Sequence, residues 1–94
     1  DIQVFSQFRE LCDLNLNHNL LSWIEPDVFR PIFNLKKLNL AYNRFVYLNS
    51  TLFKHFSQLI ELSFAHNQIK YIERNTFSSN SFASLKILNL KSNY

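Results

Sequence analysis

Apolar residues recur along the chain in one fixed arrangement with a period of about 24 residues. Each period opens with two leucines three positions apart, followed by Leu or Phe two positions later and by Asn three positions after that. This pattern divides the chain into repeats at 11–34, 35–58 and 59–84, with partial repeats at 1–10 and 85–94. A period of this length indicates a stack of coils, because no single coil can bury its apolar residues alone.

The opening apolar residues have the spacing of a short strand whose alternate side chains point inward. The Asn that follows stands where the strand gives way to a turn, and a buried Asn there can bond the neighbouring turn through both its amide and its carbonyl. We therefore expect a ladder of stacked side chains from Asn19, Asn43, Asn67 and Asn93. Since Gly is absent, we expect Asn, Ser and Asp to make the turns, because they tolerate left-handed backbone and cap their own chain.

Further apolar residues keep the same period on the return half of each coil. They predict inward columns at Leu21, Phe45 and Ile69; at Ile24, Leu48 and Ile72; at Phe29, Phe53 and Phe77; and at Ile32, Phe56 and Phe82. Phe5 and Phe8 stand before Leu11 as Phe29 and Ile32 stand before Leu35. Residues 1–10 are therefore expected to be the back half of an earlier coil, and the 94 residues to be one domain, an excerpt from a longer solenoid.

The repeats resemble the 24-residue typical class of extracellular leucine-rich repeats, whose pattern is LxxLxLxxNxLxxLxxxxFxxLxx. Four in-phase copies cover essentially the whole chain. The resemblance implies a repeat solenoid of the α/β leucine-rich repeat type, with a short parallel β-sheet on its concave face and loops or 3₁₀ turns on its convex face. Toll and Toll-like receptor ectodomains, chaoptin- and Slit-like proteins and secreted insect immune proteins use this class, which implies an extracellular molecule that binds proteins, glycans or lipids, commonly with dimerisation.

The chain departs from the family pattern in a few places. Glu25, Asn49 and Glu73 stand where the family often has Pro, and Phe64 replaces a strand leucine. Two additional residues at Ser78–Ser81 are expected to bulge the convex side locally.

Residues that point outward from the predicted strands form columns across the concave face, with neighbouring strands about 4.8 Å apart. Asp13, Lys37 and Glu61 in one column suggest pairs that compensate one another on a solvated surface, each worth about 0.2–1 kcal/mol. The alternative is a contact surface for a partner. Its candidate residues are Asp13, Asn15, Asn17, His18, Lys37, Asn39, Tyr42, Glu61, Ser63, His66, Asn89 and Lys91.

A second candidate surface lies on the lateral side of the coils, which is called the flank below. Trp23, Tyr47 and Tyr71 recur one position before an inward residue, so their side chains should point outward and stack on one another. Such a column either shields the lateral face or forms a partner-binding edge, since exposed Tyr and Trp are favoured at interface cores.

Asn49-Ser50-Thr51 is a glycosylation sequon. In a chain so rich in Asn and Ser, chance alone accounts for such a match, so the sequence by itself is weak support for secretion. The position is more informative, because Asn49 stands where the chain leaves the flank for the convex side. A glycan there would leave the concave sheet open.

Several kinds of site are not expected. His18 and His66 share a column but lie about 9–10 Å apart with Tyr42 between them, and no neighbouring carboxylate or thiol completes a metal site. They are expected to be two exposed histidines, a pH-sensitive contact being the alternative. Without glycine there is no phosphate-binding loop, and no nucleophile–base pair recurs, so neither a cofactor nor an enzyme activity is expected. Cys12 is alone and gives no information on redox compartment.

The net charge of +3 is mild and spread evenly, so nucleic acid is not expected as the principal ligand. No apolar stretch is long enough to span a bilayer, so membrane attachment would use segments outside this sequence. We expect a protein-binding segment of a Toll-like, innate-immune receptor ectodomain, secreted or at the cell surface. An adhesion or axon-guidance protein of the chaoptin or Slit kind is the alternative, and a purely structural stretch of solenoid is a third.

Overall fold

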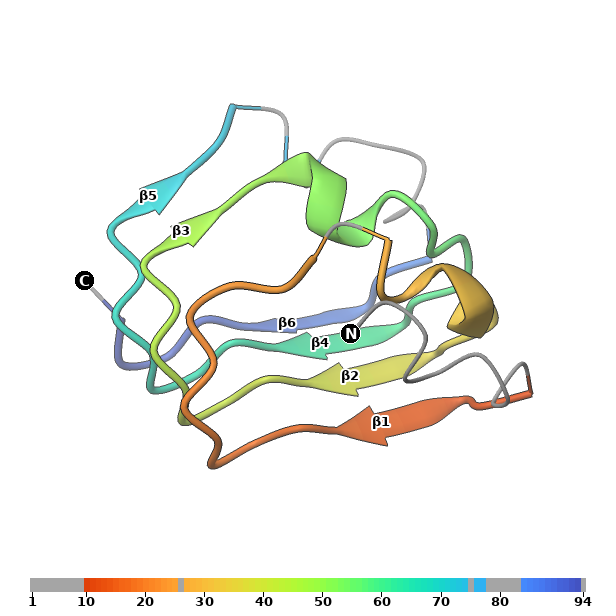
Figure 1. The fold of residues 1–94 in the computed structure, drawn as a ribbon, viewed down its shortest axis with the longest axis horizontal. Helices are drawn as coiled ribbons and strands as arrows, with labels where there is room; N and C mark the ends of the chain where they lie inside the picture. The colour runs from red at the N-terminus through yellow and green to blue at the C-terminus, as the bar shows by residue number, and fades with distance from the viewer. Residues whose placement is uncertain (1–9, 26, 75, 78–83, 94) are drawn as a thin grey trace.

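The computed structural model describes residues 10–25, 27–74, 76–77 and 84–93. Four short strands lie side by side in a parallel sheet of order β1-β2-β4-β6, one strand from each successive coil (Figure 1). They are β1 (Asp13–Asn15), β2 (Lys37–Asn39), β4 (Glu61–Ser63) and β6 (Ile87–Asn89). The outward side of this sheet is called the concave face below. The early half-coil at Phe5 and Phe8, the insertion at Ser78–Ser81 and Phe82 lie outside the described residues.

The register of the sheet follows the repeat without a slip. Leu14 pairs with Leu38, Leu38 with Leu62, and Leu62 with Leu88. Because successive strand residues point to opposite sides, this register sends one set of side chains into the coils and lines up the other set in columns. The predicted parallel sheet and its columns are confirmed.

The return half of the coils contains a smaller sheet and two single turns of 3₁₀ helix. Strands β3 (Tyr47–Leu48) and β5 (Tyr71–Ile72) pair in parallel on the flank, beside the main sheet in Figure 1. The 3₁₀ helix η1 (Arg30–Ile32) precedes β2 and lies near its start, and η2 (Ser50–Phe53) follows β3 (Figure 1). Pro31 favours η1, because its fixed φ suits the first turn of a helix. Asn49 caps η2, and the predicted 3₁₀ turns are confirmed.

The core is a continuous column of Leu, Ile and Phe side chains from successive coils. Phe64, a departure from the family pattern, is fully buried and meets Phe45 and Phe53 edge-to-face, with ring centroids 5.4 and 5.9 Å apart. This geometry suits the quadrupoles of aromatic rings. Burial is most complete in the middle coils and decreases toward Leu14 and Leu88, because a coil's inward side chains need a neighbour on each side.

The predicted Asn ladder is confirmed, and its bonds join successive coils. The amide nitrogen of Asn43 donates to the carbonyls of Leu40 and Ala41 in its own coil and to that of Leu16 in the preceding coil, each at 3.1 Å. Its Oδ1 accepts from the backbone N–H of Leu21, also in the preceding coil, at 3.0 Å. The ladder residues of the next two repeats make the same set of bonds.

Left-handed backbone occurs one residue before each ladder Asn, at His18, Tyr42, His66 and Ser92, with φ between 56° and 59°. The expectation that Asn, Ser and Asp take this conformation is therefore wrong except at Ser92. The ladder Asn must aim its amide into the coil, so the chain reverses at the preceding residue, whose side chain points outward. A non-glycine residue pays about 1–2 kcal/mol for this conformation. A bond from its N–H to the next coil offsets the cost, as from Tyr42 to the Ala65 carbonyl at 2.9 Å.

Candidate binding surfaces

A row of charged side chains crosses the concave face. Asp13, Lys37 and Glu61 stand in register on β1, β2 and β4 and line a hollow of about 190 Å³. The expected pairing within this row does not form as direct contacts: within the described residues, every ion pair meets at Asp27. Opposite charges therefore stand side by side on neighbouring strands without a direct ion pair in the described chain.

The neighbouring column, at the ends of the strands, caps the turns, as expected for Asn and Ser in a chain without Gly. Asn15 Oδ1 accepts from the N–H of Asn17, two residues on, at 3.0 Å. Its equivalents Asn39, Ser63 and Asn89 each accept the same bond from the residue two positions ahead. These are Asx and Ser turns that bend the chain out of the strand. The sequence signal for these turns is the Asn or Ser that stands two residues before each bend.

A stack of three aromatic rings stands beside the sheet, on the left-handed turns. The ring centroids of His18 and Tyr42 lie 4.3 Å apart with a 10° angle between planes, and those of Tyr42 and His66 have the same values. The repeat spacing predicted that the three residues share one column, but not that their rings are in contact. The strand spacing of a parallel sheet brings the rings to stacking distance. Tyr42 is 46% exposed, and Arg44 and Gln68 line the shallow hollow beside the stack.

A third column of the concave face consists of Asn17, Ala41, Ala65 and Lys91, and some of these residues are buried while others are exposed. Ala41 and Ala65 are buried, so they support the turns rather than form the shallow strip beside Tyr42 that their small size suggests. Lys91 is exposed, whereas Asn17 is half-buried. The candidate residues that remain available for contact are thus mainly the charged row and the ring stack. Their side chains face outward, and these side chains make no hydrogen bond or ion pair of their own within the described chain.

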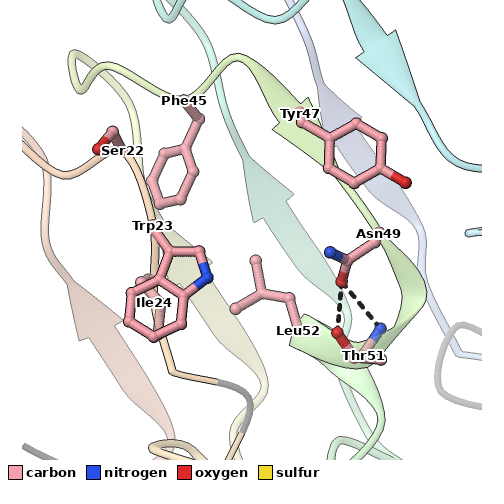
Figure 2. A pocket seen from close by; sticks show the side chains of 8 residues that line it. All are labelled: Ser22, Trp23, Ile24, Phe45, Tyr47, Asn49, Thr51 and Leu52. Carbon is pink, nitrogen blue, oxygen red and sulfur yellow. Dashed lines mark hydrogen bonds between the residues drawn. The ribbon is translucent and has the colours of Figure 1, made fainter.

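The flank aromatics are exposed as the spacing predicts, with Trp23 at 66%, Tyr47 at 49% and Tyr71 at 63%. The expected stacking is wrong: in the described part of the chain, no ring contact joins them. Tyr47 and Tyr71 sit opposite each other in the β3–β5 pair. Between Trp23 and Tyr47 there is instead a hollow of about 140 Å³, and the two rings stand on either side of it (Figure 2).

The hollow on the flank follows from a missing strand pair. The repeats 11–34, 35–58 and 59–84 are called repeats 1, 2 and 3. Backbone N–H groups of residues 70, 71 and 73 donate to the carbonyls of Val46 and Leu48, and these bonds connect repeat 3 to repeat 2. Residues 46–49 make no equivalent bond to residues 22–24 within the described chain, so the flank between repeats 1 and 2 is open. The walls of this opening, the flank groove, are formed by Ser22, Trp23, Ile24, Phe45, Tyr47, Asn49, Thr51 and Leu52.

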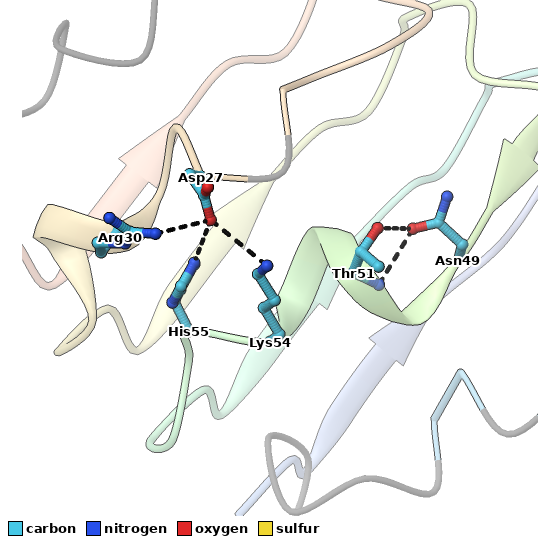
Figure 3. Close-up of polar contacts among 6 residues, drawn as sticks. All are labelled: Asp27, Arg30, Asn49, Thr51, Lys54 and His55. Carbon is cyan, nitrogen blue, oxygen red and sulfur yellow. Dashed lines mark hydrogen bonds and ion pairs between the residues drawn. The ribbon is translucent and has the colours of Figure 1, made fainter.

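Asn49 lies at one end of the flank groove and caps η2. Its Oδ1 accepts from the backbone N–H of Thr51 at 3.1 Å and from the Thr51 hydroxyl (Figure 3). The next residue, Ser50, donates through its N–H and its hydroxyl to Glu73 Oε1 at 3.0 and 3.1 Å. At Asn49, one of the positions where the family often has Pro, this chain therefore uses a side-chain cap, and Glu73 connects repeat 3 to repeat 2.

A charged cluster on the return side was not predicted. Asp27 Oδ1 contacts His55 Nε2 at 2.9 Å, Arg30 Nη2 at 3.2 Å and Lys54 Nζ at 3.4 Å (Figure 3). The hydrogen bond with His55 is the largest cause that lowers the pKa of the Asp27 carboxyl; burial opposes it, and the charges of Arg30 and Lys54 lower the pKa further. Arg30 and Lys54 are 24 positions apart, so writing out the convex columns would have revealed the pair.

In the described residues no group of three or more His, Cys, Asp and Glu side chains is arranged to hold a metal ion. The same part of the chain has no helix of the length and apolarity needed to cross a membrane. Cys12 is an exposed free thiol.

The comparisons with known proteins agree on one family. The model described as Leucine rich repeat matches residues 1–45 and 33–94. No curated protein matches the sequence significantly. Among solved structures, the chain resembles Toll in the Toll–Spatzle complex of Drosophila (24% identity, 99% of this chain, TM-score 0.90) and the APL1 leucine-rich repeat domain (24%, 99%, 0.88). It also resembles TLR13 in complex with ssRNA13 (35%, 95%, 0.85). It spans 12% of the Toll chain, 24% of the APL1 chain and 12% of the TLR13 chain.

Proposed function

The chain belongs to the leucine-rich repeat family, and on that premise we propose that it is a protein-binding segment of an extracellular, Toll-like innate-immune receptor ectodomain. Its concave face contacts a protein ligand or a second receptor chain. The contact residues are the charged row of Asp13, Lys37 and Glu61 together with the ring stack of His18, Tyr42 and His66. The likeness to Toll and APL1 supports this assignment at the level of the fold.

The charged row is the observation that carries the proposal. The three side chains place opposite charges next to one another across a shallow hollow and make no ion pair within the described chain, so their charges are available to a partner. Alternating charges in a shallow hollow select a partner with the opposite order, since complementary charge gives specificity and register more than raw affinity. The adjacent Tyr42 supplies the exposed aromatic surface that is enriched in interface cores.

The test uses the full-length protein displayed on cells and exposed to extracellular fluid from its source. The double variant Asp13→Lys with Lys37→Glu reverses the row at constant net charge, and Arg74→Glu, at an exposed residue outside the sheet, is the control. We expect a protein retained by the native chain and by the control to be lost at least about tenfold from the double variant, as for about 1.4 kcal/mol. Equal retention by all three chains would refute a concave contact.

A single-stranded nucleic acid is a second candidate ligand. The mild net charge alone does not favour nucleic acid, but the ring stack is a surface on which unpaired bases can stack, and the TLR13 neighbour was solved with an RNA. With single-stranded RNA as probe, Tyr42→Ala should then weaken binding about tenfold, and added salt should weaken it further. If RNA does not bind at low salt, this candidate is eliminated.

A further inference from the structure

The flank groove ends at an asparagine whose amide nitrogen is available. Asn49 uses its Oδ1 to cap η2, whereas its Nδ2 makes no hydrogen bond within the described chain. Figure 2 shows this nitrogen on the side away from Thr51, toward the groove. The side chain is half-buried, and the local bonds with Thr51 hold its amide in one orientation.

The groove offers the apolar surfaces that a sugar would contact. Tyr47 stands two positions before Asn49 on an extended segment, so the two side chains leave the same side of the chain. Trp23 stands on the opposite wall with most of its ring exposed, and Leu52 contributes to the floor (Figure 2). A pyranose has one face of C–H groups and polar hydroxyls at its rim, which matches rings that combine an apolar body with a polar tip.

We propose that Asn49 carries an N-linked glycan and that its first N-acetylhexosamine occupies the flank groove between Trp23 and Tyr47. In the transfer, Asn49 Nδ2 forms a bond to the anomeric carbon of a lipid-linked oligosaccharyl diphosphate. The bond from that carbon to the diphosphate oxygen breaks, the lipid diphosphate leaves, and Nδ2 loses one proton to a base of the transferase. The sugar thus covers the one flank opening that strand pairing leaves between repeats 1 and 2.

This proposal rests on the proposed extracellular location and changes how the flank is interpreted. The aromatic edge at Trp23 and Tyr47, otherwise a candidate for partner binding, becomes the seat of the protein's own glycan. The concave face stays open, because Asn49 directly follows β3, which lies outside the four-stranded sheet (Figure 1). Tyr71, which lines no part of the groove, remains uncovered.

The first experiment asks whether Asn49 is modified. The full-length protein is secreted from a eukaryotic host. The mass of the tryptic peptide of residues 45–54 is measured by mass spectrometry before and after treatment with peptide N-glycosidase. We expect a glycan mass that the enzyme removes with conversion of the linked asparagine to aspartate. Thr51→Ser should keep the modification, whereas Thr51→Val should lose it. An unmodified peptide from secreted protein overturns this proposal alone, whereas failure to enter the secretory route overturns the proposed location as well.

The second experiment asks where the first sugar sits. An endoglycosidase trims the glycan to one N-acetylhexosamine, and thermal unfolding is compared among the trimmed protein, the fully deglycosylated protein and the same pair carrying Trp23→Leu and Tyr47→Leu. We expect the single sugar to raise the Tm by a few degrees in the native background and to have little effect in the double variant, as a coupling between contacting groups requires. Tyr71→Leu is the matched control. An equal rise in Tm in all three backgrounds would show that the first sugar does not occupy the flank groove.

Discussion

The sheet side and the flank side of this solenoid join the same coils in different ways. On the sheet side, every pair of neighbouring repeats is connected by strand bonds, by a ladder Asn and by the N–H of a left-handed residue. On the flank, repeats 2 and 3 pair through β3 and β5, whereas repeats 1 and 2 do not pair. The sheet side therefore fixes the stack, and the flank is where individual repeats differ.

The largest effect is expected from breaking the ladder. Asn43→Ala removes the donor for three carbonyls and the acceptor for the Leu21 N–H, in a turn that is largely closed to water. Since each buried group left without a partner costs about 1–3 kcal/mol, we expect the free energy of unfolding to fall by at least about 3 kcal/mol. Urea unfolding of the full-length protein measures this, with exposed Gln68→Ala as control. A loss no larger than that of the control would contradict the structural role of the ladder.

The second prediction compares one position in the open and the closed flank. Leu48, a residue of β3, is fully buried, whereas its equivalent Ile24 is half-buried and lines the flank groove. Leu48→Ala should lower the free energy of unfolding by about 3 kcal/mol and Ile24→Ala by about half as much, because the cost follows the buried volume removed. Equal losses in urea unfolding would mean that the open flank is as tightly packed as the closed one.

A smaller effect on the free energy of unfolding is expected at Tyr42, where two substitutions distinguish the cost of the left-handed backbone from the contribution of the ring contacts. Tyr42→Ala and Tyr42→Gly both remove two ring contacts, for a loss of about 1 kcal/mol. Glycine adopts the left-handed conformation without the side-chain clash, so the Gly variant should recover much of the loss that the Ala variant keeps. A Gly variant less stable than the Ala variant would show that the left-handed backbone carries no strain.

The smallest effect concerns the Asp27 cluster, which links repeats 1 and 2 on the return side. Its carboxyl has a lowered pKa in the folded protein, so the charged form stabilises the fold above the unfolded value of 3.8 and this contribution disappears as the pH falls through the folded pKa. Asp27→Asn should therefore lower the Tm slightly at about pH 5 and above and have no effect near about pH 2. A Tm difference that persists at the acid end, or that salt does not reduce, would point away from electrostatics.

The features that recur in every repeat were predictable from the sequence. A strict period fixes the register, so the Leu14, Leu38, Leu62 and Leu88 row and the ladder followed directly from the spacing. The left-handed residue was placed incorrectly, because residue preference suggested Asn while the geometry of the ladder demands the position before it. His18, Tyr42 and His66 were in the right column, but stacking depends on rotamers that spacing does not specify.

What distinguishes one repeat from the next was harder to predict. The open flank corresponds to Ser22 in repeat 1, where repeat 2 has Val46, and a single change in strand preference is too weak to forecast a missing strand pair. The Asp27 cluster joins residues 27 positions or more apart through Lys54 and His55, on a side of the coil where the apolar period gives no guidance. The columns of outward residues were thus predicted correctly and the bonding within them was not, while their role as a binding surface stays a prediction.

The ladder also gives the solenoid a direction of assembly. Asn43 reaches back 27 residues to Leu16, and Asn67 reaches back the same distance to Leu40. A coil's turn is therefore completed only when the following coil has been synthesised, and it never waits for a distant part of the chain. A chain emerging from the ribosome can close one coil at a time in the order of translation, because every contact that holds the stack is local on the scale of a single repeat.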